Sequence, residues 1–199
     1  LHSGHYGNYV PNPAMRLAGL LASMKDDDGR VRVPGYYDGI ALTAPDRALL
    51  AASGDDDAAL RKRLGIARAE RVGETYQMAM QYPSLNVRGM ASAAVDERAA
   101  NVVPSEATAE LDLRTTPETD GAALFALLKA HIERQGYHLT DGPPSDEERA
   151  AHDKLASFTM GASEKSVRMP VDSSVGRWAY EAAEAVATAG DKPVRIRMV

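Results

Sequence analysis

NVVPSEATAELDLRTTPETDGAALFALLKAHIERQGYHLT spans residues 101–140 and contains the two periodicities that decide the fold. Residues 106–115 alternate apolar and polar side chains, which is the two-residue period of a strand with one buried face. Residues 116–132 then place leucine and isoleucine on one helical face, and Gly136 is suited to end that helix. With a further short strand at 137–140, the stretch predicts strand, helix, strand.

Two elements upstream complete the pattern. Residues 84–90 alternate again and predict a partner strand. Residues 13–24 predict a helix, because Asn12 can cap it and Pro13 suits its first position. The order helix, strand, strand, helix, strand indicates an α+β fold, a ferredoxin-like plait with an antiparallel sheet and helices on one face. The first strand of such a plait would precede Leu1, so we expect it to be missing.

Composition and turn signals divide the chain into three parts. Residues 1–140 form the first domain, with a helical insertion at about 40–81 whose charged and alanine-rich surfaces suit the outside of a core. Residues 141–172 form a connecting segment that opens on a Gly-Pro-Pro turn. Residues 173–199 read as a helix and a strand. Because the chain lacks an initiator methionine and stops on a strand pattern, we expect a fragment cut at both ends.

Charge and hydropathy exclude two broad classes of partner. The formal net charge is −5 and the pI is about 5.6, whereas a general nucleic-acid surface needs a basic excess. No apolar run approaches the roughly 20 residues that span a bilayer, and the start has no signal-peptide pattern. The absence of cysteine excludes disulfides and thiolate metal sites. We expect no nucleic acid, no membrane and a cytoplasmic location.

Two groups of side chains could bind a metal. His2 and His5 lie three residues apart, but zinc needs at least three ligands and the other histidines share no spacing with them. By themselves they are better interpreted as ordinary loop histidines than as a self-contained metal site. Glu147 and Glu148 resemble the paired carboxylates of two-metal hydrolases. The better interpretation places them in the first turn of a helix after Ser145, where negative charge is favourable.

Two further residues could bind a substrate. Arg114 lies at the end of the 106–115 strand, where a guanidinium can hold a carboxylate through two hydrogen bonds. Its alternative is a structural salt bridge, for instance near Asp112. Asn101 precedes the same strand and could be no more than a turn residue.

Six motifs in this order resemble one family, the dimeric zinc metallopeptidases that include carnosinase, aminoacylase, acetylornithine deacetylase and succinyl-diaminopimelate desuccinylase. The motifs are Leu1-His2-Ser3-Gly4-His5-Tyr6-Gly7, Val10-Pro11-Asn12-Pro13, Val33-Pro34-Gly35-Tyr36-Tyr37-Asp38, Tyr82-Pro83-Ser84-Leu85, Asn101-Val102-Val103-Pro104-Ser105-Glu106-Ala107 and Leu111-Asp112-Leu113-Arg114. The helical insertion points to the carnosinase-like dipeptidase branch.

The resemblance implies a lid and dimerisation domain at residues 1–140 and the start of a returning, incomplete catalytic domain at 173–199. In this family the histidine of the first motif reaches the partner subunit's site and stabilises the oxyanion, and on that match His2 takes the role. Asn101 and Arg114 match residues expected to hold the terminal carboxylate of the substrate. The implied substrates are dipeptides or N-acyl amino acids, and the implied partner is a second copy joined through the lid.

The sequence also departs from the family. The His-x-Asp ligand pair, the Glu-Glu pair at the metals and the last ligating histidine have no counterpart here. We therefore expect two zinc ions in the catalytic domain of the parent protein, none bound by this chain, and no activity from this chain alone. The alternative is a non-enzymatic α+β association or ligand-binding module in which His2 and Arg114 are structural.

Overall fold

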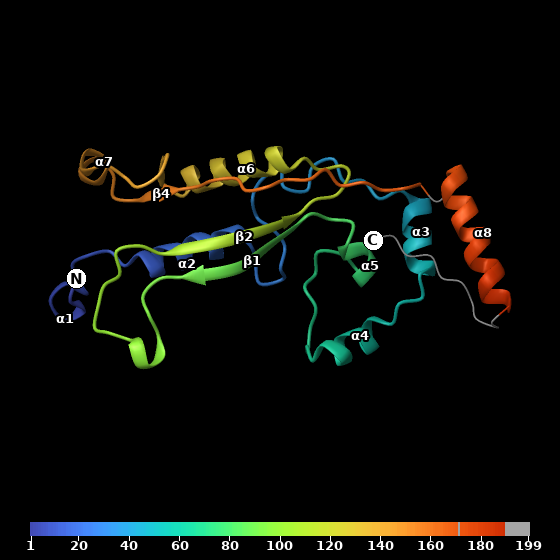
Figure 1. The fold of residues 1–199 in the computed structure, drawn as a ribbon, viewed down its shortest axis with the longest axis horizontal. Helices are drawn as coiled ribbons and strands as arrows, with labels where there is room; N and C mark the ends of the chain where they lie inside the picture. The colour runs from blue at the N-terminus through green and yellow to red at the C-terminus, as the bar shows by residue number, and fades with distance from the viewer. Residues whose placement is uncertain (171, 190–199) are drawn as a thin grey trace. The chain divides into compact units, whose positions relative to one another are not determined.

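The computed structural model describes residues 1–170 and 172–189, which divide into two compact units (Figure 1). The first unit contains Leu1–Tyr36, Ser84–Arg114 and Gly121–Ser163. The second contains Tyr37–Pro83, Thr115–Asp120 and Glu164–Val199. The chain therefore passes between the units several times.

The first unit is built on an antiparallel hairpin of two strands, β1 (Ser84–Ala91) and β2 (Thr108–Arg114). The ladder runs from Ser84 opposite Arg114 to Ala91 opposite Thr108 and shifts by one residue at Arg88. Such a bulge bends the strand locally and increases its twist. Both strands lie where the alternation predicted them.

Two helices carry the apolar core of this unit. Helix α2 (Pro13–Met24) begins as predicted, because Asn12 Oδ1 accepts from the Ala14 amide at 2.9 Å. Helix α6 (Gly121–Arg134) supplies the other apolar face. The buried apolar side chains of the two helices are Leu20, Met24, Leu124, Leu128 and Ile132.

The predicted start of α6 at Thr116 is wrong by five residues. The Thr116 amide donates to Thr119 Oγ1 at 2.8 Å, and the Thr119 amide donates to the Thr116 carbonyl at 2.9 Å. These bonds close a turn before the helix begins. A threonine side chain that bonds nearby backbone competes with helical hydrogen bonding.

A short crossover completes the first unit. Strand β3 (His138–Thr140) is followed by α7 (Asp146–Ala151) and β4 (Leu155–Ser157), and β4 pairs with β3 in parallel. The sequence predicted β3 and the start of α7 but not β4. A strand of three residues is too short to show a period. Mixed helices and strands confirm the α+β class.

The second unit is largely helical. It contains α3 (Ala44–Ala52), α4 (Asp57–Leu64) and α5 (Tyr76–Ala79), where the sequence predicted helical pieces. It also contains α8 (Ser174–Ala189), whose start is fixed by Ser173 Oγ accepting from the Gly176 amide at 3.0 Å. The predicted strand at 193–199 lies outside the described residues. The predicted domain boundaries remain a prediction.

No helix within the described residues is both long enough and apolar enough to cross a bilayer.

Candidate functional site

The first residues of the chain pair with a segment a hundred residues away. The Ser3 amide donates to the Asn101 carbonyl at 2.9 Å, and the Val103 amide donates to the Leu1 carbonyl at 2.8 Å. Between these bonds His2 and Val102 form an antiparallel bridge. Val103 is 4 % exposed and anchors the segment in the core. The pairing brings the predicted site residues His2 and Asn101 onto neighbouring backbone.

The local turn at His2 determines how its ring is presented. His2 caps the short helix α1 (Ser3–Tyr6), and its Nδ1 lies 3.0 Å from the Gly4 amide, from which it accepts. In a neutral imidazole the second nitrogen then carries the hydrogen, so Nε2–H is the donor. A side chain at Gly4 would meet the His2 ring at 3.0–3.1 Å. Glycine at this position therefore allows the amide to approach the ring.

Arg114 lies at the last residue of β2 and is 79 % exposed in its side chain. Its Nε lies 3.2 Å from Asp112 Oδ2, two residues earlier on the same face of the strand. The salt bridge considered as its alternative role is therefore present. The pair holds one side of a solvent-exposed guanidinium, which is compatible with carboxylate binding.

The three predicted site residues do not form one cluster in a single chain. β2 runs away from the loop that carries Asn101 and ends at Arg114, and six residue steps along a strand cover about 20 Å. Figure 1 shows the same arrangement, with α1 at one end of the hairpin and the end of β2 at the other. The structure thus brings His2 and Asn101 together and leaves Arg114 at the opposite end.

The paired glutamates have a structural position. Ser145 and Glu148 form a capping box at the start of α7, in which the Ser145 amide donates to Glu148 Oε2 at 2.7 Å. That backbone hydrogen bond holds the pKa of Glu148 below its ordinary value. Glu148 Oε1 also lies 3.6 Å from His138 Nε2. The helix-start interpretation of Glu147 and Glu148 agrees with this geometry.

Among residues 1–170 and 172–189, no three His, Asp or Glu side chains gather in a way that could hold a metal ion. His2 and His5 are neighbours, with ring centroids 5.0 Å apart, but no third ligand joins them. These residues do not fit a zinc site.

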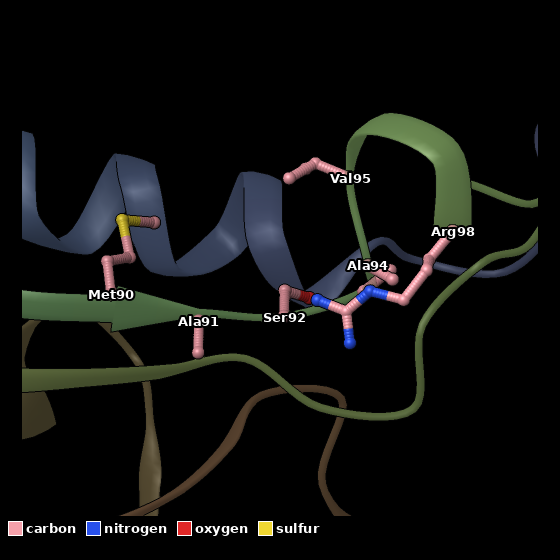
Figure 2. Close-up of a pocket in the computed structure, with 7 residues that line it drawn as sticks. Met90, Ala91, Ser92, Ala94, Val95 and Arg98 are labelled. Carbon is pink, nitrogen blue, oxygen red and sulfur yellow. The ribbon is translucent and has the colours of Figure 1, made fainter.

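The structure adds a hollow that the sequence did not indicate. Residues 90–95 and Arg98 line a space of about 550 Å³ at the end of β1 and the loop that follows it (Figure 2). Met90 and Val95 in its wall are 51 % and 68 % exposed. In the sequence, the short apolar stretch 93–95 is the signal that could have pointed to it.

Comparison with known proteins shows the family to which the chain belongs. Residues 1–140 match the family model described as a peptidase dimerisation domain of the M20 peptidases. The chain therefore belongs to this family, which confirms the predicted resemblance.

The curated relatives show which enzymes the chain resembles. The chain is 26 % identical over 136 residues to the Cys-Gly metallodipeptidase of Saccharomyces cerevisiae, covering 67 % of this chain and 28 % of the relative. It is 27 % identical over 138 residues to the Beta-Ala-His dipeptidase of Homo sapiens, covering 66 % and 27 %. The chain thus spans less than a third of the length of these relatives.

Solved structures share the fold. A metallo-carboxypeptidase of the M20 family from Sulfolobus solfataricus aligns with a TM-score of 0.71 and 29 % identity, covering 94 % of this chain and 40 % of that one. Human carnosine dipeptidase 1 aligns with a TM-score of 0.74 and 22 % identity, covering 100 % and 40 %. These alignments confirm the predicted fold class.

Proposed function

We propose that this chain is the lid and homodimerisation part of a two-zinc metallopeptidase that hydrolyses dipeptides or N-acyl amino acids. The observation that carries the proposal is the match of residues 1–140 to a peptidase dimerisation domain. The metallodipeptidase and dipeptidase names of its relatives support the reaction class. We assign the zinc ions to a catalytic domain of the parent protein, so this chain alone is inactive.

His2 is proposed as the oxyanion donor. Amide hydrolysis places negative charge on the carbonyl oxygen only as the tetrahedral intermediate forms, so a fixed donor there stabilises the transition state selectively. The hydrogen bond from the Gly4 amide leaves Nε2–H as the His2 donor. The backbone bonds to residues 101–103 hold the turn in place.

Asn101 and Arg114 are proposed to hold the terminal carboxylate of the substrate. In one chain Asn101 lies before the start of β2 and Arg114 at its end, and β2 itself is about 20 Å long, so we expect that one carboxylate does not reach both. A site that uses both must take Asn101 and His2 from one copy and Arg114 from the other. A dimer is therefore required both for Asn101 to bind the carboxylate together with Arg114 and for His2 to act in trans.

The outer edge of β1 is the surface we propose for that dimer. Within the described residues β1 pairs only with β2, which leaves its other edge open. Val87 and Met90 on β1, and Val95 just beyond it, are 42 %, 51 % and 68 % exposed. Figure 2 shows Met90 and Val95. An open edge with apolar side chains favours pairing with another strand.

Helix α8 supports the proposed domain boundary at residue 173. Val175, Trp178 and Val186 fall on one face at helical spacing, and they are 54 %, 69 % and 75 % exposed. An amphipathic helix normally buries such a face. We propose that the catalytic domain of the parent protein covers it.

The test uses the parent protein, zinc and a dipeptide substrate. His2→Ala should lower kcat by about a hundredfold or more, the scale of losing one oxyanion donor. His5→Ala is the matched control and should keep most activity. An absence of hydrolysis, or full activity in His2→Ala, would leave the non-enzymatic association module as the function.

Mixing two inactive variants tests the use of both copies. When His2→Ala and Arg114→Ala subunits are combined, half of the dimers are hybrids with one intact composite site. About a quarter of wild-type activity should then return if the dimer is symmetric. No recovery would show that His2 and Arg114 act within one chain.

A further inference from the structure

We propose that Arg168 is a positioning residue for Arg114, acting through the two chain segments that continue from the paired ends of β1 and β2. The inference rests on the proposed function of Arg114 as the carboxylate-binding residue. It assigns a role to a segment, residues 164–170, that has no helix or strand of its own.

The starting point is the end of the β1–β2 ladder. Arg114 is the last residue of β2, and Ser84 opposite it is the first residue of β1. Tyr36 Oη donates to the Ser84 carbonyl at 2.9 Å, which fixes the β1 side. Among the residues that the structure describes, the β1–β2 ladder has no pair beyond Ser84 and Arg114. Side-chain hydrogen bonds connect the two segments that continue from these residues.

Arg168 supplies that connection. Its Nη2 donates to Gln81 Oε1 at 3.0 Å, three residues before Ser84, and its Nη1 donates to the Glu118 carboxylate, four residues after Arg114. One guanidinium therefore bonds both segments. Two donors on a planar group suit this bridging, whereas the single ammonium of lysine is a point charge.

A second residue of the same segment strengthens the contact. Ser166 Oγ donates to the carbonyl of Thr115 at 2.9 Å, and Thr115 directly follows Arg114. The backbone next to the proposed carboxylate-binding residue is thus held by a residue 51 positions away. Ser166 and Arg168 together form a clamp.

The hydrogen bond from Arg168 to Gln81 ends on a buried side chain that is itself held by further hydrogen bonds. Gln81 is 3 % exposed, and its Nε2 donates to the Gln77 carbonyl at 3.2 Å. Gln77, 2 % exposed, donates in turn to Asp55 Oδ2 at 2.6 Å. A buried amide N–H is costly to leave unpaired, which favours these two acceptors for Gln81 Nε2 and Gln77 Nε2.

The ion pair between Arg168 and Glu118 is about two-thirds buried, with side-chain exposures of 30 % for Arg168 and 32 % for Glu118. Burial by itself would raise the pKa of Glu118, but its hydrogen bonds, including the one from Arg168, hold the pKa below its ordinary value. The carboxylate is therefore charged at neutral pH, as the clamp requires.

Hydrogen exchange on this chain tests the clamp directly. Arg168→Ala should raise amide exchange about tenfold at residues 82, 84 and 85 and at 112–116, the scale of losing a hydrogen bond to a charged group. Arg168→Lys should give a partial effect. Arg88→Ala removes an exposed ion pair to Glu110 in the middle of the same ladder and should change neither end. Unchanged exchange, or a uniform rise across the first unit, would overturn the inference.

Kinetics in the parent protein test the link to Arg114. Arg168→Ala should raise KM about tenfold for a dipeptide with a free carboxylate, with kcat changing much less. The same dipeptide with an amidated C-terminus should show no further loss. Equal losses on both substrates would refute positioning. If the wild-type parent shows no hydrolysis, the proposed function fails, while the exchange pattern still decides whether the clamp exists.

Discussion

Removing the buried hydrogen bond between α2 and α6 should weaken the first unit in a pH-dependent way. His131 is 5 % exposed, and its Nε2 lies 2.9 Å from Ser23 Oγ. Since the Ser23 hydroxyl already donates to the Leu20 carbonyl at 2.6 Å, it accepts from His131. Ser23→Ala would leave a buried imidazole N–H unpaired, at a cost of about 1–3 kcal/mol.

The sign of the pH dependence follows from the surroundings of the ring. Burial, assisted by nearby Arg134, lowers the pKa of His131 below its ordinary value. The unfolded state therefore binds the proton more readily than the folded state. Stability from this group is complete above an unfolded pKa of about 6.5 and is lost as the pH falls from there through the folded pKa.

Urea denaturation of wild type and His131→Gln at about pH 8 and about pH 5 measures this effect, since the subtraction removes the other titrating groups. The wild type should lose its advantage over His131→Gln at the lower pH. Ser23→Ala should be destabilised at both. An advantage that is equal at the two pH values would refute the argument that His131 is buried as the neutral ring.

Three further predictions concern stability and can be checked by urea or thermal unfolding. Leu128→Ala should cost about 2–5 kcal/mol because Leu128 has no exposed surface, whereas Leu64→Ala, 59 % exposed, should stay within about 0.5 kcal/mol. Gly65→Ala should cost about 1–2 kcal/mol because Gly65 ends α4 at φ +69°, while Gly19→Ala, inside α2 with open space at its Cβ, should gain about 0.5–1 kcal/mol. Ser145→Ala should cost about 1 kcal/mol and raise amide exchange in α7, because it removes half of the capping box.

The elements predicted correctly are those whose signals are local. Asn12 and Ser145 cap helices where the sequence placed them, because a capping side chain and the amides it accepts from lie within three residues. The start of α6 was predicted wrongly, also because of a local hydrogen bond. Thr119 offers the Thr116 amide a competing local bond, and the apolar periodicity cannot show which bond wins.

The spacing of residue types in the sequence could not predict contacts between distant segments. The β3–β4 pairing joins strands of three residues each, and the bonds of Arg168 to Gln81 and Glu118 cross 87 and 50 positions. No spacing rule connects such residues in a single sequence. The motifs could single out His2, Asn101 and Arg114, whose roles stay predictions, but could not show which of them are neighbours.

The way His2 is held makes it a sharp probe of the proposed chemistry. Its position depends on main-chain bonds on both sides, from the Ser3 amide to Asn101 and from the Val103 amide to Leu1. Replacing the side chain leaves these bonds intact and removes the exposed cap on the Gly4 amide and the ring contact with His5. A substitution by Ala should therefore cost little stability, since exposed caps contribute about 1 kcal/mol. Any hundredfold loss of hydrolysis in a His2 variant that unfolds like the wild type must then come from the missing imidazole donor.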